Sequence, residues 1–217
     1  VSALLAMIWL SKAYVKYSND ASLTIALFIN MSCFVLLFSG LRQSIAISLG
    51  FVAFEFAKNK KVFFFLAVTI IAILFHTSAF MLIFMYPLYH IKLNRKWLLF
   101  IIPLLGTVFL FNQQIFGFLG LILNQFTDYD TEISMTGSVT MLILFVLFAI
   151  FSYWVPDESE LDTDTIGMRN FLLLSVALQM FAPLHPLAMR MNYYYIAFIP
   201  LLIPRIISSS SERWAQV

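Results

Sequence analysis

Charged residues stand only in short breaks between long apolar runs, and this pattern sets the class of fold. The chain is 62% hydrophobic and only 11% charged, whereas a soluble domain carries about 25% charged residues. A mean hydropathy of +0.92 leaves too few polar side chains to cover the surface in water. Because helices satisfy their own backbone hydrogen bonds in lipid, the sequence predicts an all-α protein, a polytopic transmembrane helical bundle.

The basic residues give this bundle an orientation. When the apolar runs are threaded as successive spans, all but two of the 13 Lys and Arg residues fall on one side, which the positive-inside rule makes cytoplasmic. The exceptions, Arg42 and Arg190, each open an apolar segment at the opposite face. A cation placed there favours an anionic ligand, and the alternative is an arginine that only anchors a helix end.

The apolar run 62–89 decides the topology. As one helix it would leave Lys92, Arg95 and Lys96 outside, whereas a hairpin broken near His76 returns them to the cytoplasm. The positive-inside rule favours the hairpin. Each arm would be roughly 21 Å long, against a hydrocarbon core of about 30 Å. We therefore expect a short hairpin or re-entrant pair, with His76 at the bottom of an outward-facing pocket.

The domain organisation follows from the same runs. We expect a single transmembrane domain over residues 1–207 and a polar cytoplasmic tail over 208–217, with Ser208–Ser211 as a linker. The chain opens at Val1 inside an apolar run that resembles the second half of a helix, so we expect an N-terminally truncated fragment. No soluble domain is expected.

The residues on the opposite face suggest phosphate and sugar binding. Arg42 would lie in the first turn of its helix, where free N–H groups and a guanidinium together suit a phosphate. Arg190 is followed by Asn192, Tyr193 and Tyr194, which would add flat rings for sugar faces; tyrosines here could equally form an aromatic belt. His76 could donate to a pyrophosphate oxygen, act as a general base, or bond only to a backbone carbonyl.

Other chemistries find little support. The sequence has no H-E-x-x-H, no paired cysteines, no P-loop and no G-x-S-x-G, and Cys33 stands alone in an apolar run. Asp128-Tyr129-Asp130 has the spacing of a metal–nucleotide-sugar motif, but it would lie outside, where nucleotide sugars are normally absent. We expect Glu55 to pair with Lys58 or Lys60, and His90 to be interfacial. No metal, cofactor or nucleic acid is expected.

Several stretches resemble the EpsG family of bacterial membrane proteins, which is related to Wzy-type polysaccharide polymerases. They are Leu41–Ala46 (L-R-Q-S-I-A), Phe75–Ala79 (F-H-T-S-A), and Arg190 with its tyrosines. The resemblance covers roughly Ser22 to Pro204. It departs from one pattern, because the R-x₁₀-G of some Wzy polymerases would need a glycine where Ala53 stands.

The resemblance implies a metal-independent, glycosyltransferase-type polymerase with a GT-C-like helical architecture, acting in extracellular or capsular polysaccharide biosynthesis. It would transfer a growing chain from polyprenyl pyrophosphate to the next lipid-linked repeat unit, at the outer face of the bacterial cytoplasmic membrane. A chain-length regulator and a flippase of the same pathway would be partners. On this hypothesis, Arg42 and Arg190 hold the pyrophosphate, and His76 binds it or deprotonates the acceptor. The residues expected to position substrate are Gln43, Ser78, Asn192, Tyr193 and Tyr194.

Three other functions fit the same residues. A flippase or carrier for anionic lipid-linked substrate would use the two arginines in transit. A membrane acyltransferase that modifies glycans would use His76 as its base. A non-catalytic subunit of an export assembly would need neither.

Overall fold

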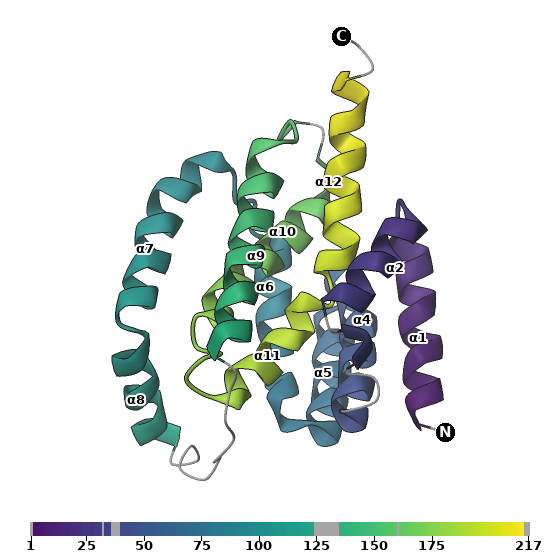
Figure 1. The fold of residues 1–217 in the computed structure, drawn as a ribbon. Coiled ribbons are helices and arrows are strands. Elements are labelled where there is room, and N and C mark those ends of the chain that lie inside the picture. Colours follow the sequence, from purple (N-terminus) through teal and green to yellow (C-terminus); the bar gives the residue numbers. More distant parts are fainter. Residues whose placement is uncertain (1, 32, 36–39, 124–134, 160, 215–217) are drawn as a thin grey trace.

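The computed structural model describes all residues except 1, 32, 36–39, 124–134, 160 and 215–217. The described residues form helices and no strand, which confirms the all-α prediction (Figure 1). In chain order these helices are α1 (Ser2–Tyr17), α2 (Ala21–Asn30), α4 (Leu41–Lys58), α5 (Val62–Phe75), η1 (Thr77–Phe84), α6 (Met85–His90), η2 (Arg95–Trp97), α7 (Leu98–Leu110), α8 (Asn112–Leu123), α9 (Met135–Trp154), α10 (Thr163–Gln179), α11 (Pro186–Ile196) and α12 (Ile199–Trp214).

A tight turn folds α5 back along α4. Lys60 adopts a left-handed conformation with φ 55°. Its N–H bonds to the carbonyl of Ala57 at 3.0 Å, and the N–H of Lys61 bonds to that of Phe56 at 2.9 Å. This pair of bonds is a Schellman motif, which satisfies the last carbonyls of a helix and reverses the chain.

The chain breaks at His76, as the sequence predicts. His76 is extended, with φ −153° and ψ 118°, and separates α5 from η1. Pro87 has no backbone N–H, so it cannot donate the hydrogen bond that an α-helix would make to the preceding turn. The segment before α6 is the 3-10 helix η1. At the far end of the hairpin, His90 Nε2 lies 3.1 Å from the carbonyl oxygen of Ala57. Lys92 therefore returns to the end of the molecule that holds Lys58.

Aromatic rings form the centre of the bundle. Phe54 of α4, Phe171 of α10 and Phe198 are fully buried, with ring centroids 5.1–6.0 Å apart. Edge and tilted contacts of this kind add to the stabilisation from burial. Tyr195 donates a 2.5 Å hydrogen bond to the carbonyl of Met81, so α11 is fixed against η1. The core thus joins the hairpin to the C-terminal helices.

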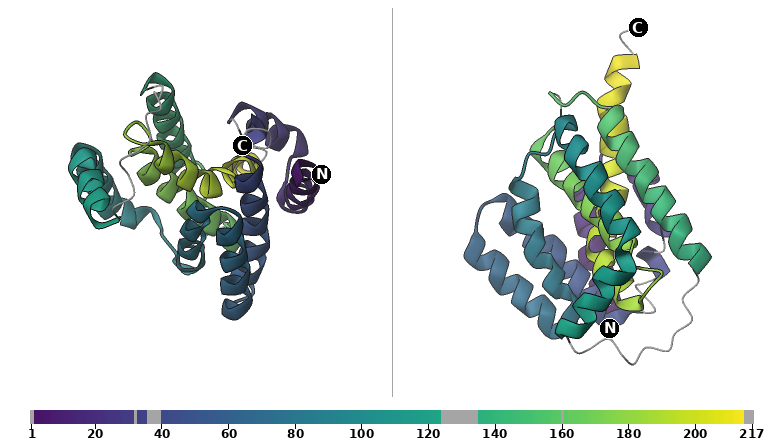
Figure 2. Two further views of the ribbon diagram at one scale, coloured as in Figure 1. Left: turned by 90° about the horizontal axis from the view of Figure 1, so that it is seen from below. Right: turned by 90° about the vertical axis from the view of Figure 1, so that its left-hand side faces the viewer.

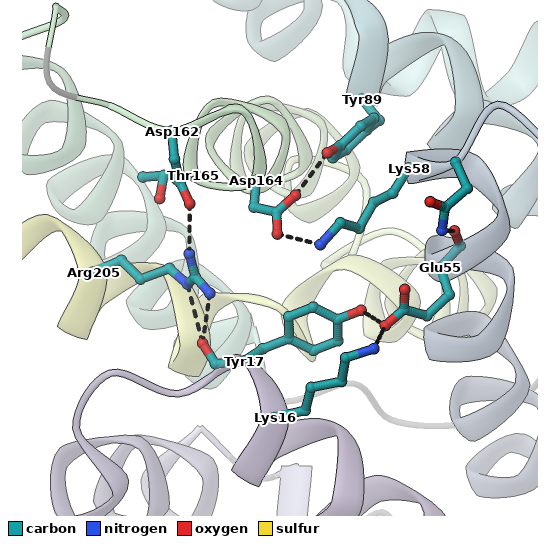
Figure 3. Close-up of polar contacts among 10 residues, drawn as sticks. Lys16, Tyr17, Glu55, Lys58, Tyr89, Asp162, Asp164, Thr165 and Arg205 are labelled. Carbon is teal, nitrogen blue, oxygen red and sulfur yellow. Dashed lines mark hydrogen bonds and ion pairs between the residues drawn. The ribbon is translucent and has the colours of Figure 1, made fainter.

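Ion pairs gather at one end of the bundle, the upper end in Figure 1. We call it the basic end and define it by Lys16, Lys58, Arg95, Arg169 and Arg205. Figure 3 shows part of its network. The carboxylate of Glu55 accepts from Lys16 and from the Tyr17 hydroxyl. The prediction that Glu55 pairs with Lys58 or Lys60 is therefore wrong, because α1 brings a closer cation.

The start of α10 supplies two more acids of this network, Asp164 and its N-cap Asp162. Asp164 accepts a 2.6 Å bond from Tyr89 and pairs with Lys58. Asp162 caps α10 through the N–H of Thr165, and it pairs with Arg205 at 3.0 Å. These contacts tie α4, α6, α10 and α12 together.

Arg169 and Arg95 complete the basic end. Arg169 is 1% exposed; it donates to the carbonyl of Leu93 at 2.6 Å and lies 3.9 Å from the centre of the Tyr153 ring. Arg95 donates to the carbonyls of Tyr153 and Pro156, which close the C-terminus of α9. All five cations that define this end bond to protein groups.

The outer surface is apolar. Exposed fractions reach 80% for Leu74 of α5, 76% for Leu99 of α7 and 69% for Trp154 of α9. Helices α7 and α8 lie at the periphery in both Figures 1 and 2. Large exposed apolar surfaces of this kind suit lipid rather than water.

The described residues contain one helix, Gly137–Trp154, that is long and apolar enough to cross a membrane alone. A second span would be formed by a bent pair of helices, Arg95–Leu110 and Asn112–Phe118, if the two are counted as one span despite the 73° bend between them.

Two apolar stretches of the sequence are not single helices. Helix α2 ends at Asn30, within the apolar stretch of residues 22–40. The run Met191–Pro204 is divided between α11 and α12 around Ala197. Helix α12 then continues to Trp214, so Ser208–Ser211 are helical rather than a linker. Ser208 bonds back to the carbonyl of Pro204 at 2.9 Å, which lets a serine-rich segment remain helical.

Candidate functional site

Three predicted site residues meet at the end opposite the basic end. Arg42 lies there in the first turn of α4, His76 caps the end of α5, and α11 brings Arg190. Both guanidinium groups exert a positive potential on the His76 ring. Arg42 is exposed, whereas His76 and Arg190 are partly buried. We call this the arginine–histidine end and define it by Arg42, His76, His185 and Arg190.

Gln43 links the two arginine-bearing helices. It is 4% exposed, and its Nε2 donates a 2.6 Å hydrogen bond to the backbone carbonyl of Arg190. Gln43 follows Arg42 in the first turn of α4, so this one bond fixes the start of α4 against the second turn of α11. The Gln43 amide therefore bonds to the protein itself.

A second chain of contacts holds His76. Ser78 Oγ lies 3.4 Å from Nδ1 of His76 and 3.3 Å from the hydroxyl of Tyr194. Both distances are at the long end for hydrogen bonds. Ser78 and Tyr194 are each 1% exposed. The imidazole is therefore oriented from its inner side by two buried hydroxyl groups.

Asn192 joins α11 to α10. It is fully buried; its Oδ1 accepts from Ser175 at 2.7 Å, and its Nδ2 donates to Gln179 Oε1 at 3.0 Å. The next residue, Tyr193, is partly buried. Together with Cys33 it lines an apolar crevice of about 10 Å³. This volume is close to that of one water probe, so the crevice is too small for a sugar.

His185 lies beside Arg190 in the turn before α11. Its Nδ1 accepts from the N–H of Leu187 at 3.1 Å and caps the helix. Its ring packs on Phe116 of α8, with centroids 5.4 Å apart. Burial lowers the pKa of His185, and the positive charge of Arg190 lowers it further. His185 therefore positions the start of α11, the helix that carries Arg190.

The structure therefore separates the predicted site into two groups. Arg42, His76 and Arg190 carry the charge and the ionisable ring. Gln43, Ser78, Asn192 and Tyr194, all expected to touch substrate, are buried and bond within the protein. Polar residues in an apolar helix must find partners whether or not a ligand exists, and so residue type alone could not distinguish support from binding.

Two further predictions concern other places. Asp128 and Asp130 lie outside the described residues. Within the described residues, no group of three or more His, Cys, Asp or Glu side chains could hold a metal ion.

A cavity of about 240 Å³ lies at the basic end, lined by Asp162, Thr165, Arg205 and neighbours. No predicted site residue lines it, and Asp162 and Arg205 there already bond to each other.

The model of the EpsG family matches residues 1–215 of the chain. No curated protein and no solved structure matches it.

Proposed function

Because this chain belongs to the EpsG family, we propose that it polymerises lipid-linked oligosaccharide repeat units in extracellular or capsular polysaccharide biosynthesis. The family itself is one of membrane proteins associated with exopolysaccharide production, which agrees with the apolar helices. In the proposed reaction, the growing chain is transferred from polyprenyl pyrophosphate to the next repeat unit without a metal ion.

The observation that carries this proposal is that Arg42 and Arg190 both act with positive potential on the ring of His76. Two cations away from the basic end suit a ligand with at least two negative charges. The N-terminus of α4 adds first-turn N–H groups that have no partner within the helix, and a favourable dipole, at the same place. A pyrophosphate leaving group has this charge, and it develops more as its bond to the sugar breaks.

The reaction follows from this charge distribution. A hydroxyl of the acceptor unit attacks C1 of the donor sugar while the bond between C1 and the pyrophosphate oxygen breaks. The hydroxyl proton passes to His76 or to a phosphate oxygen. Arg42 and Arg190 stabilise the departing pyrophosphate, and fixed cations in a site of low dielectric are effective because they need no reorganisation.

The positive-inside rule orients the site. With the basic end in the cytoplasm, the arginine–histidine end faces outward from a multi-pass protein in the bacterial cytoplasmic membrane. The lipid bilayer and the polyprenyl-pyrophosphate-linked oligosaccharide are then its immediate partners. A flippase that supplies the units and a regulator of chain length would act beside it.

The test is a gel ladder of surface polysaccharide from a polymerase-null host. It compares the wild-type gene with Arg42→Ala, Arg190→Ala and the control Lys92→Ala, an exposed cation at the other end. Membrane levels are matched by blotting. We expect both arginine variants to collapse the ladder to single repeat units, and the lysine variant to keep it.

Other outcomes would overturn the proposal. A full ladder from both arginine variants removes the arginines from the reaction. Repeat units that accumulate at the inner face indicate a carrier. A ladder of normal length that lacks acyl groups indicates an acyltransferase.

A further inference from the structure

The three groups Tyr194 Oη, Ser78 Oγ and His76 Nδ1 form one chain of contacts, 3.3 Å and 3.4 Å long. Ser78 and Tyr194 are buried, each 1% exposed. Within the described residues, the Tyr194 hydroxyl has no hydrogen-bond partner besides Ser78, and the Ser78 hydroxyl has none besides Tyr194 and His76. The direction of each bond can therefore be worked out by counting protons.

The buried phenol of Tyr194 must donate its proton, and Ser78 Oγ is its acceptor. The Ser78 proton then needs an acceptor of its own, and His76 Nδ1 is the one in reach. If Nδ1 instead carried a proton, either the Tyr194 or the Ser78 hydroxyl would be left as a buried donor without an acceptor, which is unfavourable. One arrangement satisfies all three groups, and in it Nδ1 is an acceptor.

We propose that Tyr194 and Ser78 fix His76 as the neutral tautomer protonated at Nε2, so that His76 donates a hydrogen bond to a phosphate oxygen and is not the general base. This inference rests on the proposed function for the identity of the anion. The acceptor's hydroxyl proton then passes to an oxygen of the departing pyrophosphate. Ser78 and Tyr194 become positioning residues that hold one tautomer.

The surroundings of His76 agree with this role. Arg42 and Arg190 both act on the ring with positive potential, which opposes a second proton on the imidazole. Within the described residues Nε2 has no hydrogen bond, and the ring is only partly buried. A donor beside two guanidinium groups extends the same anion-binding set.

The tautomer can be measured directly. Full-length protein labelled with ¹⁵N-histidine is placed in lipid nanodiscs, and the His76 signals are assigned as those missing from His76→Gln. We expect at neutral pH an unprotonated-type shift for Nδ1 and a protonated-type shift for Nε2. Ser78→Ala should give a mixture of tautomers. The control Thr77→Ala, at the exposed neighbouring position, should leave the spectrum unchanged.

A protonated Nδ1 in the wild type would overturn the inference, as would a Ser78→Ala spectrum identical to the wild type. Tyr194→Phe gives an independent check, because it removes the first donor and should also mix the tautomers. These readouts do not depend on polymerase activity. They therefore separate a failure of this inference from a failure of the proposed function.

The chemical role is tested with inorganic pyrophosphate and with substitutions. Pyrophosphate should shift the His76 Nε2 signal in the wild type and not in the Arg42→Ala and Arg190→Ala double variant. In the polysaccharide ladder, His76→Gln keeps a donor and should retain a reduced ladder, whereas His76→Glu should abolish it. The reverse order, with Glu active and Gln inactive, would show a general base and overturn the inference.

Discussion

The backbone carbonyl of Arg190 accepts a 2.6 Å hydrogen bond from Nε2 of the buried Gln43. This bond makes the separation of Arg42 and Arg190 a property of the fold, since it joins α4 to α11 next to both arginines. We expect Gln43→Met, which keeps the length and removes the donor, to cost about 1 kcal/mol of unfolding free energy. Polymer yield should fall further, by roughly 10- to 100-fold, because small misplacements of catalytic groups are costly.

The ladder assay and a thermal unfolding scan measure these two effects separately. Gln114→Met is the matched control, because Gln114 is an exposed glutamine of α8 and should lose neither yield nor stability. If Gln43→Met loses stability but gives a full ladder, the bond is structural only and the spacing of the arginines does not limit the reaction.

Gly167 of α10 faces the ring of Tyr89 at the basic end. A Cβ placed on Gly167 would lie 2.4 Å from Cδ2 and 2.9 Å from Cε2 of that ring, and the Tyr89 hydroxyl is bound to Asp164 at 2.6 Å. The ring therefore cannot move aside without losing this bond. We expect Gly167→Ala to destabilise the protein by about 1–3 kcal/mol.

Gly106→Ala in α7 is the control for this substitution, because among the described residues nothing beyond the local backbone of α7 lies within 4 Å of a Cβ at Gly106. Alanine is the better helix former, so this change should stabilise by up to about 1 kcal/mol. Thermal scans in one detergent compare the two variants. Equal melting temperatures would contradict the crowding at Gly167.

The break at His76 and the gathering of basic residues could be predicted from the sequence for the same physical reason. Charges avoid the hydrocarbon core, so Lys58 at one end of the hairpin and Lys92 at the other had to return to one side. The same reasoning singled out Arg42 and Arg190. The order of charges along the chain therefore indicates which distant segments lie on the same side of the membrane.

Partners across the bundle could not be predicted in this way. Glu55 has Lys58 three residues away on its own helix, yet Lys16 reaches it from α1. Asn192 precedes a row of tyrosines that suggests sugar binding, but it is fully buried against Ser175 and Gln179. A polar side chain within an apolar helix needs a partner in any case, and tertiary packing decides which partner it receives.

Arg169 is a buried cation with a specific set of partners. It donates to the carbonyl of Leu93 at 2.6 Å, lies over the ring of Tyr153 and is 3.6 Å from Glu158. Arg169→Ala removes all of these contacts and leaves a cavity, so we expect a loss of about 3 kcal/mol of unfolding free energy.

Arg169→Lys should recover only part of that stability, because an ammonium group cannot stack on Tyr153 as a planar guanidinium does. Lys96→Ala is the control, since Lys96 is exposed at the same end. Chemical denaturation in detergent measures all three variants. A Lys variant as stable as the wild type would contradict the contribution of the stacked geometry.

His185 makes the stability of the arginine–histidine end depend on pH. Its Nδ1 caps α11 by accepting from Leu187, and burial together with Arg190 lowers its pKa below the usual value of about 6.5. The folded protein therefore binds fewer protons at this site than the unfolded chain. Stability from this group is fully present above about pH 6.5 and is lost as the pH falls through the lowered folded value.

His185→Asn isolates this effect, because asparagine is a good N-cap that does not titrate. We expect the wild type to lose more thermal stability than His185→Asn when the pH falls from about 7.5 to about 5.5, on either side of the ordinary histidine pKa. His76 and His90 are present in both proteins, so the difference between the two pH profiles reports on His185. Parallel profiles would mean that the cap does not depend on the neutral ring.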